Sequence, residues 1–415
     1  MQWRVSANGG SRMAASPEHA KRSRDGSRSR RVSDIPESST VAIADLAARM
    51  RREGHKVIDF SAGRAAEHSP DLACEAAIEG LRSGQTHQTE ARGRPEYLQA
   101  CSDKLQRCNG LVLDPESNII ATLGCKQGLV LSLLASIDVG DEVIIEDPCF
   151  VSYAPTIRLL GGVPVIAPLN PENGFRWKSD DLQHAITDKT RVILYCSPHN
   201  PAGVVHTRDD LDVIAKIAVN HDLTVIADEI YEAVTWGGRS HIPISGLPGM
   251  ESRTIGLMGM TKSYSMGGWR IGYAYAASHY IEAMTKLQQH LMTCAGSFTQ
   301  LGAARALAEE VTKAMQPLWS DWEARCQYVT EVLNSHPLFS VVMPEGGFYA
   351  WVDMSKSGLS SRDFSARLIK EKQVAVVPGG SFGPASDNYI RITCVRSWDE
   401  VREGVSRVVD FAGAL

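Results

Sequence analysis

From residue 57 onward, short runs of β-branched and aliphatic residues alternate with longer amphipathic stretches, such as 211–220, whose apolar residues recur at helical spacing. Several of the short runs are apolar throughout, which is typical of strands covered on both faces. Seven runs are predicted as strands: 118–122, 142–146, 163–168, 191–196, 224–227, 254–258 and 272–276. Strands that alternate with helices predict an α/β domain with a mostly parallel seven-stranded sheet flanked by helices.

The pattern changes near residue 300. A long helical stretch at 299–335 contains Pro317, which is predicted to kink or split it. Beyond it, strand runs at 348–352, 374–377 and 389–394 mix with two helices and predict a smaller α+β domain. The segment before Val57 is expected to pack with that domain, because chain ends often lie close together. The predicted organisation is an arm at 1–40, an N-terminal segment at 41–70, a large domain at 71–300, a connecting helical region at 301–335 and a small domain at 336–415.

The first forty residues differ in composition from the rest. The stretch 21–31 is rich in Arg and Ser and has no apolar residue. Such a segment cannot bury enough surface to offset its ordering entropy, so we expect the arm to be disordered. A solvated arm, a start at Met13, a transit peptide and a nucleic-acid arm all stay open.

Composition narrows the class of partner. The 415 residues are 43% hydrophobic and 22% charged, the balance of an ordinary globular protein, with a net charge of −5. A small-molecule partner is therefore expected rather than nucleic acid, and no apolar run is long enough to span a membrane. The nine cysteines are scattered without a CxxC pair, so we expect reduced thiols and a cytoplasmic location.

The strongest chemical signal is the segment GMTKSYSMGGWRIG at 259–272, which follows a predicted strand. The amine of Lys262 can form a Schiff base with a carbonyl cofactor. The hydroxyl of Thr261 beside it and the guanidinium of Arg270 can hold a phosphate. Taken alone, the spacing is more typical of a surface turn with a solvated lysine and arginine.

Two polar residues follow other predicted strands. Asp228 ends a buried apolar run, where a carboxylate is costly without a cation such as a protonated pyridine nitrogen. A helix cap at Glu229 is the alternative. Asn200 lies in the loop SPHNPAG just past a strand end, where ligands sit in open parallel sheets, although an ordinary loop explains it equally well.

A third turn, GCKQG, joins a strand to an apolar helix. Gly124 permits close backbone approach, and the amides of Cys125 and Lys126 would point at an anion on the helix N-terminus. An ordinary strand-to-helix turn is the alternative.

Four motifs occur in the order GCKQG, SPHNPAG, ADEIY and GMTKSYSMGGWRIG, accompanied by DPCFVSY, PEGGFY, VAVVPG and YIRIT. Over roughly residues 40–412 this order resembles the fold-type I aminotransferases, specifically the class I/II aspartate aminotransferase-like family. The resemblance implies pyridoxal 5'-phosphate (PLP) as cofactor and a homodimer with a shared active site.

The resemblance also implies roles for single residues. Lys262 would form the Schiff base and later shuttle a proton, Asp228 would pair with the pyridinium nitrogen, and Asn200 and Tyr231 would bond the phenolic oxygen. Lys262, Asp228 and Tyr231 are the catalytic candidates. The resemblance implies that the cofactor phosphate is held by Thr261, Arg270 and the turn Gly124–Cys125–Lys126. It implies that Phe150 stacks on the pyridine ring of the cofactor. The substrate would be bound by Arg391, Asn200 and the backbone of Gly63.

The chain departs from the family pattern in two places. Gln88 stands where the family usually has a tyrosine that reaches the neighbouring subunit's phosphate, and Arg64-Ala65-Ala66-Glu67 replaces the common Glu-Pro-Asp-Phe. Arg64 is a candidate for an acidic substrate side chain, with an arginine satisfied elsewhere as the alternative. His87 and Arg92 are further candidates for touching substrate.

The predicted function is amino transfer from an L-amino acid to a 2-oxo acid by a ping-pong mechanism through the Lys262 Schiff base. The alternative is a PLP-dependent lyase, cyclase or oxidase of the same fold that acts without amino transfer. A regulator with an aminotransferase-like sensor would need a DNA-binding domain, and about forty polar residues cannot build one.

Overall fold

The structure, a computed structural model, describes residue 35 and residues 37–415. Most of the arm predicted at 1–40 therefore lies outside the described residues. The first described helix, α2 (Ser39–Arg52), already includes Thr40, so the expectation that residues 39 and 40 are disordered is wrong. A helix forms here because apolar residues recur on one side of the segment and pack against Val57.

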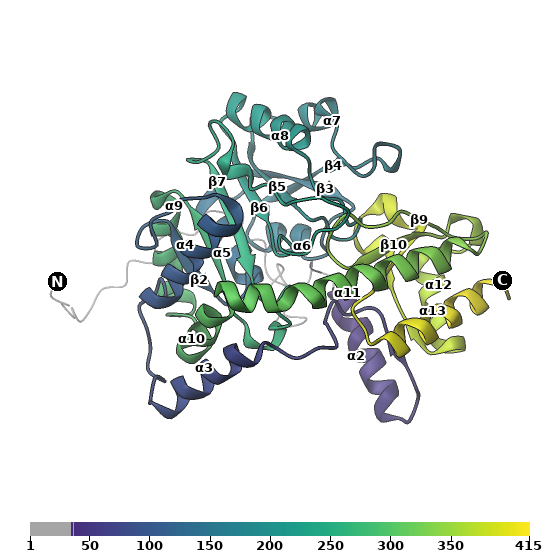
Figure 1. The fold of residues 1–415 in the computed structure, drawn as a ribbon. Coiled ribbons are helices and arrows are strands. Elements are labelled where there is room, and N and C mark those ends of the chain that lie inside the picture. Colours follow the sequence, from purple (N-terminus) through teal and green to yellow (C-terminus); the bar gives the residue numbers. More distant parts are fainter. Residues whose placement is uncertain (1–34, 36) are drawn as a thin grey trace, which may run out of the picture. The chain divides into compact units, whose positions relative to one another are not determined.

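A seven-stranded sheet has the strand order β2-β8-β7-β6-β5-β3-β4 (Figure 1). The strands are β2 (Ile119–Thr122), β3 (Glu142–Asp147), β4 (Val163–Pro168), β5 (Thr190–Cys196), β6 (Thr224–Asp228), β7 (Thr254–Gly259) and β8 (Gly272–Ala276). The strands from β7 to β4 pair in parallel, and β8 runs antiparallel to both of its neighbours. The mostly parallel sheet is confirmed, and each predicted run forms one of its strands.

Strand β5 shows why these runs are apolar throughout. Val192 and Leu194 pack into one cluster, whereas Ile193 and Tyr195 pack into another. Successive side chains point to opposite faces of a sheet, so a strand between two helical layers has no face open to water. The first cluster joins α5 (Cys125–Ser136), α6 (Tyr153–Leu159) and α9 (Ser278–Leu291), and the second joins α7 (Ser179–His184) and α8 (Arg208–Asn220).

The helical region predicted at 299–335 forms two helices, α10 (Ser297–Ala306) and α11 (Glu309–Asn334). Of the two outcomes predicted for Pro317, a kink or a split, the split is wrong, because α11 continues through it and the break falls at Leu307 and Ala308. Pro317 and Lys313 are both exposed, so water can solvate the carbonyl group that the proline leaves without a helical donor. Two further helices, α3 (Asp71–Arg82) and α4 (Pro95–Asn109), pack against α10.

The C-terminal part contains a four-stranded antiparallel sheet of order β12-β13-β10-β9 and a two-stranded parallel sheet of β1 and β11. Its elements are β9 (Ser340–Val341), β10 (Tyr349–Asp353), α12 (Ser361–Lys372), β11 (Val374–Ala375), β12 (Val377–Pro378), β13 (Tyr389–Thr393) and α13 (Trp398–Ala412). The N-terminal segment supplies β1 (Ile58–Asp59), and Ala47 of α2 packs with Ile369 and Ala375. This is the smaller α+β part of the fold; the exact domain limits stay a prediction.

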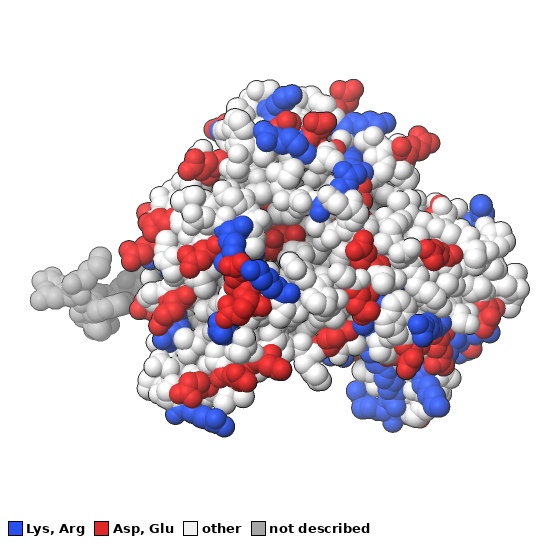
Figure 2. All heavy atoms as spheres, in the orientation of Figure 1, with Lys and Arg blue, Asp and Glu red and all other residues white. Residues whose placement is uncertain are grey.

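Acidic and basic side chains are interspersed over the face seen in Figure 2, and basic ones gather at the end of α2, where Arg49, Arg51 and Arg52 form the last turn. No helix in the described part of the chain is both long and apolar enough to cross a membrane. All nine cysteines are free thiols.

Candidate active site

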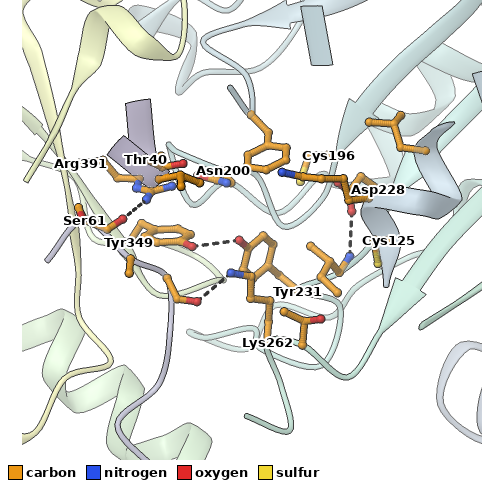
Figure 3. Close-up of a pocket in the computed structure, with 18 of the residues that line it drawn as sticks. Thr40, Ser61, Cys125, Cys196, Asn200, Asp228, Tyr231, Lys262, Tyr349 and Arg391 are labelled. Atoms are coloured by element: carbon orange, nitrogen blue, oxygen red, sulfur yellow. Dashed lines mark hydrogen bonds between the residues drawn. The ribbon is translucent and has the colours of Figure 1, made fainter. Parts of the chain in front are cut away.

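A cavity of about 440 Å³ opens where the carboxyl ends of β5, β6 and β7 meet the N-terminal segment and β13 (Figure 3). Parallel strands present their loops at the same edge, which brings together residues far apart in the sequence. Among the residues to which the family resemblance assigned a role, all except Gly124 line it: Gly63, Cys125, Lys126, Phe150, Asn200, Asp228, Tyr231, Thr261, Lys262, Arg270 and Arg391. Gly124 lies directly behind, with a φ of +74° and no room for a Cβ, which would come within 2.9 Å of Arg270.

Lys262 lies in the turn after β7, and its side chain reaches across the cavity toward the N-terminal segment. Its Nζ donates a hydrogen bond of 2.8 Å to the carbonyl oxygen of Gly63. No acidic side chain of the described residues forms an ion pair with this amine. The amine is thus held in place by a neutral acceptor and stays available for chemistry.

One end of the cavity concentrates positive charge. Within residues 37–415 the guanidinium of Arg270 donates to two acceptors, the carbonyl oxygens of Gly267 and Leu123, at 3.0 and 3.1 Å. Burial, followed by the charges of Arg270 and Lys262, lowers the pKa of Lys126. The first turn of α5 adds backbone amides to the same end, so this region is built to receive an anion.

Asp228 places a buried carboxylate deeper in the cavity. It accepts a hydrogen bond of 2.7 Å from the hydroxyl of Tyr153 and a longer one of 3.4 Å from the amide of Ile230. Burial raises the pKa of Asp228 to about 6 in spite of these two donors. A turn follows β6 at this point, so the alternative that Asp228 caps a helix at Glu229 is wrong.

Arg391 lies on the opposite wall, on β13. It is buried and donates to the backbone oxygen of Ser61 at 2.7 Å and to Oδ1 of Asn200 at 3.0 Å. Its Nε has no partner among the described residues. Its guanidinium lies 4.1 Å from the centroid of the Tyr349 ring. A guanidinium held by neutral groups in this way suits a substrate carboxylate.

The structure adds residues that the sequence reasoning did not assign. Tyr349 and Tyr153 belong to the motifs PEGGFY and DPCFVSY, but their roles arise only from contacts with distant segments. Thr40 also lines the cavity, although it was predicted to lie in a disordered arm. The serine and threonine run before the apolar residues of α2 is a helix-start signal that would have found it.

The candidates at the two departures from the family pattern lie outside the cavity lining. Arg64, His87 and Gln88 are exposed, and Arg92 faces a different groove. The second departure has a structural use, because Glu67 forms an ion pair of 2.8 Å with Arg325 of α11.

Comparisons with known proteins agree with this geometry. The chain matches the family model described as aminotransferase class I and II over residues 55–408. It is 37% identical over 379 residues to an aspartate aminotransferase of Pyrococcus abyssi, covering 91% of this chain and 96% of that protein. It is also 37% identical over 353 residues to aromatic-amino-acid aminotransferase 2 of Thermococcus litoralis, covering 85% and 90%.

A solved structure of aspartate aminotransferase from Thermus thermophilus with maleate aligns with a TM-score of 0.88 at 33% identity and covers 94% of this chain and 99% of that one. This chain belongs to the class I and II aminotransferase family. It is therefore a PLP-dependent transferase that moves an amino group, which confirms the predicted reaction and cofactor and disfavours the alternative without amino transfer.

The cavity of this aminotransferase contains unpaired charges that are complementary to the charges of PLP. Arg270 at the α5 end has no carboxylate partner among the described residues, and a phosphate would neutralise its charge. Asp228 has no basic partner among the same residues, and a protonated ring nitrogen would supply one.

The raised pKa of Asp228 leads to a stability prediction for the cofactor-free enzyme. The folded state holds this proton more tightly than the unfolded chain, so the ionised carboxylate destabilises the fold as pH rises from about 4 to above 6. Asp228→Asn should therefore increase the free energy of unfolding at pH 8 by roughly 3 kcal/mol, with no difference near pH 4. Equilibrium denaturation at the two pH values measures this. The same variant should bind PLP more weakly. A lower free energy of unfolding of Asp228→Asn at pH 8 would contradict the raised pKa of Asp228.

Proposed function

We propose that Lys262 carries PLP as a Schiff base, with the phosphate at the α5 end and the ring nitrogen at Asp228. The observation that best supports this is the position of the Lys262 amine, which has no acidic partner among the described residues, between the cationic end of the cavity and the buried carboxylate of Asp228. Bound there, PLP supplies an electron sink for the charge left on the substrate Cα.

The remaining groups bind and orient. Arg391, held by Ser61 and Asn200, receives the α-carboxylate of the amino acid. The amide nitrogen of Asn200 stays free to donate toward the cofactor, because its Oδ1 already accepts from Arg391. Once the amino acid has taken its place, the amine of Lys262 removes the Cα proton.

For the substrate, we infer an acidic amino acid with a second carboxylate. Lys126 is a further cation in the lining, with its Nζ 5.5 Å from the centroid of the Phe150 ring and with no acidic partner among the described residues. Relatives named aspartate aminotransferase, and a solved relative with the dicarboxylate maleate, support this choice. Phe150 beside Lys126 supplies an apolar surface that also accommodates an aromatic substrate.

Lys262→Ala tests the Schiff base. The variant should lose the visible absorbance of the lysine-bound cofactor and fall in kcat by at least about 1,000-fold, because both the attachment point and the proton acceptor are gone. Lys286→Ala removes an exposed lysine of α9 and serves as the matched control. A Lys262→Ala protein that keeps the absorbance would overturn the assignment.

Lys126→Met tests the substrate class. Removal of the ammonium group should lower kcat/KM for aspartate by about 10- to 100-fold, since a charge-assisted contact in a partly buried site is lost. The value for phenylalanine should change by less than about threefold, because the backbone amide at this position is kept. Lys126→Arg, which retains the charge, is the control. An equal loss for both substrates would argue against a second carboxylate site at Lys126.

We further propose a homodimer. Ile78 and Leu81 of α3 are 45% and 47% exposed, and Leu291 and Met292 at the end of α9 are 51% and 48% exposed. Apolar side chains of this size are better covered by protein than by water. Sedimentation should give about twice the chain mass of 45.2 kDa. A monomer mass at micromolar concentration would refute it.

We also infer a cytoplasmic location, since nine unpaired thiols suit a reducing compartment. In the sedimentation samples, prepared without reductant and then unfolded, a thiol reagent should label all nine cysteines of each chain. A disulfide found between any two would count against this location.

A further inference from the structure

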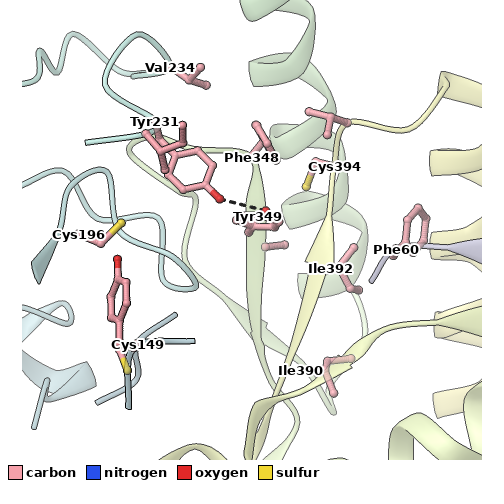
Figure 4. Packing of buried hydrophobic residues seen from close by; sticks show 14 of the residues in the cluster. Phe60, Cys149, Cys196, Tyr231, Val234, Phe348, Tyr349, Ile390, Ile392 and Cys394 are labelled. Carbon is pink, nitrogen blue, oxygen red and sulfur yellow. Dashed lines mark hydrogen bonds between the residues drawn. The ribbon is translucent and has the colours of Figure 1, made fainter. Parts of the chain in front are cut away.

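Tyr349 is a buried phenol at the centre of the cavity. It begins β10 and is 2% exposed, yet its hydroxyl points into the space beside Lys262 (Figure 3). Figure 4 shows the same hydroxyl meeting that of Tyr231. Gly63 lies close to both the Tyr349 hydroxyl and the Lys262 amine. A Cβ added to Gly63 would lie 1.8 Å from the Tyr349 hydroxyl oxygen and 3.1 Å from Nζ of Lys262. The hydroxyl and the amine therefore border the same small gap.

Several contacts hold the ring in this place. The hydroxyls of Tyr349 and Tyr231 are 3.1 Å apart, and the two rings meet edge to face with centroids 5.9 Å apart. The guanidinium of Arg391 also packs on the ring of Tyr349, 4.1 Å from the ring centroid. Phe348, the preceding residue, packs against Tyr231 and Trp322 and anchors the start of the strand. The hydroxyl thus has a defined position and one neutral hydrogen-bond partner.

The charged and titratable groups that face this hydroxyl are Lys262, Arg391 and Tyr231. Burial by itself would raise the pKa of Tyr349, but the nearby positive charges of Lys262 and Arg391, together with the hydrogen bond from Tyr231, outweigh it and lower the pKa below its ordinary value. Tyr231 shows the opposite direction, because burial and the neighbouring Tyr349 raise its pKa. Of the two phenols, Tyr349 is the one suited to lose its proton.

We propose that Tyr349 is a second proton-carrying residue of the catalytic centre, which orients the amine of Lys262 and exchanges a proton with it. When Lys262 has taken the Cα proton, its ammonium group passes a proton to the phenolate oxygen of Tyr349. The N–H bond of Lys262 breaks, the O–H bond of Tyr349 forms, and a neutral amine and a neutral phenol result. No electron transfer is involved. Tyr231 donates to the phenolate oxygen and stabilises it until the proton arrives.

This proposal rests on the proposed role of Lys262, but the geometry gives it a separate test. Tyr349→Phe keeps the ring on which Arg391 stacks and removes only the hydroxyl. The KM for the amino acid should therefore change by less than about threefold, while kcat should fall by about 10- to 100-fold, as for the loss of a general acid–base group.

Two readouts separate proton transfer from a merely structural role. The primary isotope effect on kcat with Cα-deuterated amino acid should increase in Tyr349→Phe, because proton transfer becomes more rate-limiting. The midpoint of the absorbance titration of the PLP-loaded enzyme should move to lower pH, because the protonated form loses a neighbouring phenolate. Tyr349→His, which restores a group that can exchange protons, should recover part of the isotope-effect change.

Tyr97→Phe is the matched control, since Tyr97 is also fully buried but lies outside the cavity lining and its hydroxyl has no hydrogen-bond partner among the described residues. It should leave both readouts at their wild-type values. A Tyr349→Phe enzyme with unchanged isotope effect and unchanged titration midpoint would overturn the proposal, whatever its kcat. In that outcome the Schiff-base role of Lys262, judged by the absorbance of Lys262→Ala, would stand unaffected.

Discussion

The ionised carboxylate of Asp228, buried at the end of β6 with no ion-pair partner among the described residues, is the constraint on which the rest of the site depends. A carboxylate in such a place is costly unless it is paired, and here burial already raises its pKa to about 6. The protein supplies one strong donor, Tyr153, and leaves the remaining charge uncompensated. A protonated ring nitrogen would supply the missing cation at Asp228, and Arg270 with the backbone amides of the first turn of α5 would hold the phosphate in the proposed arrangement.

A second buried carboxylate, that of Glu146, helps to position the loop that carries Asn200. Glu146 at the end of β3 accepts from the amide of Cys196 at 3.1 Å, and its Oε2 lies 3.5 Å from Nε2 of His199. His199 directly precedes Asn200, and its other ring nitrogen accepts from the amide of Ala202. The histidine ring therefore ties the loop that carries Asn200 to the end of β3, where Nε2 lies 3.1 Å from the carbonyl oxygen of Pro148, and closes the loop on itself through Ala202. This attachment fixes the amide that in turn holds Arg391.

The agreement between sequence and structure has a clear physical basis for the sheet and for Lys262. Strands between two helical layers must be apolar on both faces, so β3, β5 and β6 were recognisable from composition alone. The functional residues that follow these strands lie close together in the structure, because the carboxyl ends of parallel strands lie at the same edge of the sheet. Two predictions were wrong because they rested on local sequence rules that tertiary packing or solvent exposure overrode. Pro317 does not end its helix because its side of α11 faces water, and Thr40 is helical because α2 has Val57 and Ile369 to pack against.

By itself, the sequence determined the α/β fold, the lysine, and the order of motifs that identifies the aminotransferase family, since these depend on periodicity and on residues close together in the chain. Only the tertiary structure decided which phenol lies beside which amine. Tyr349 comes 87 positions after Lys262 in the chain and Arg391 a further 42, so no local pattern relates them. Their contact arises from the packing of β10 and β13 against the carboxyl edge of the large sheet, and this packing sets the charge around Tyr349.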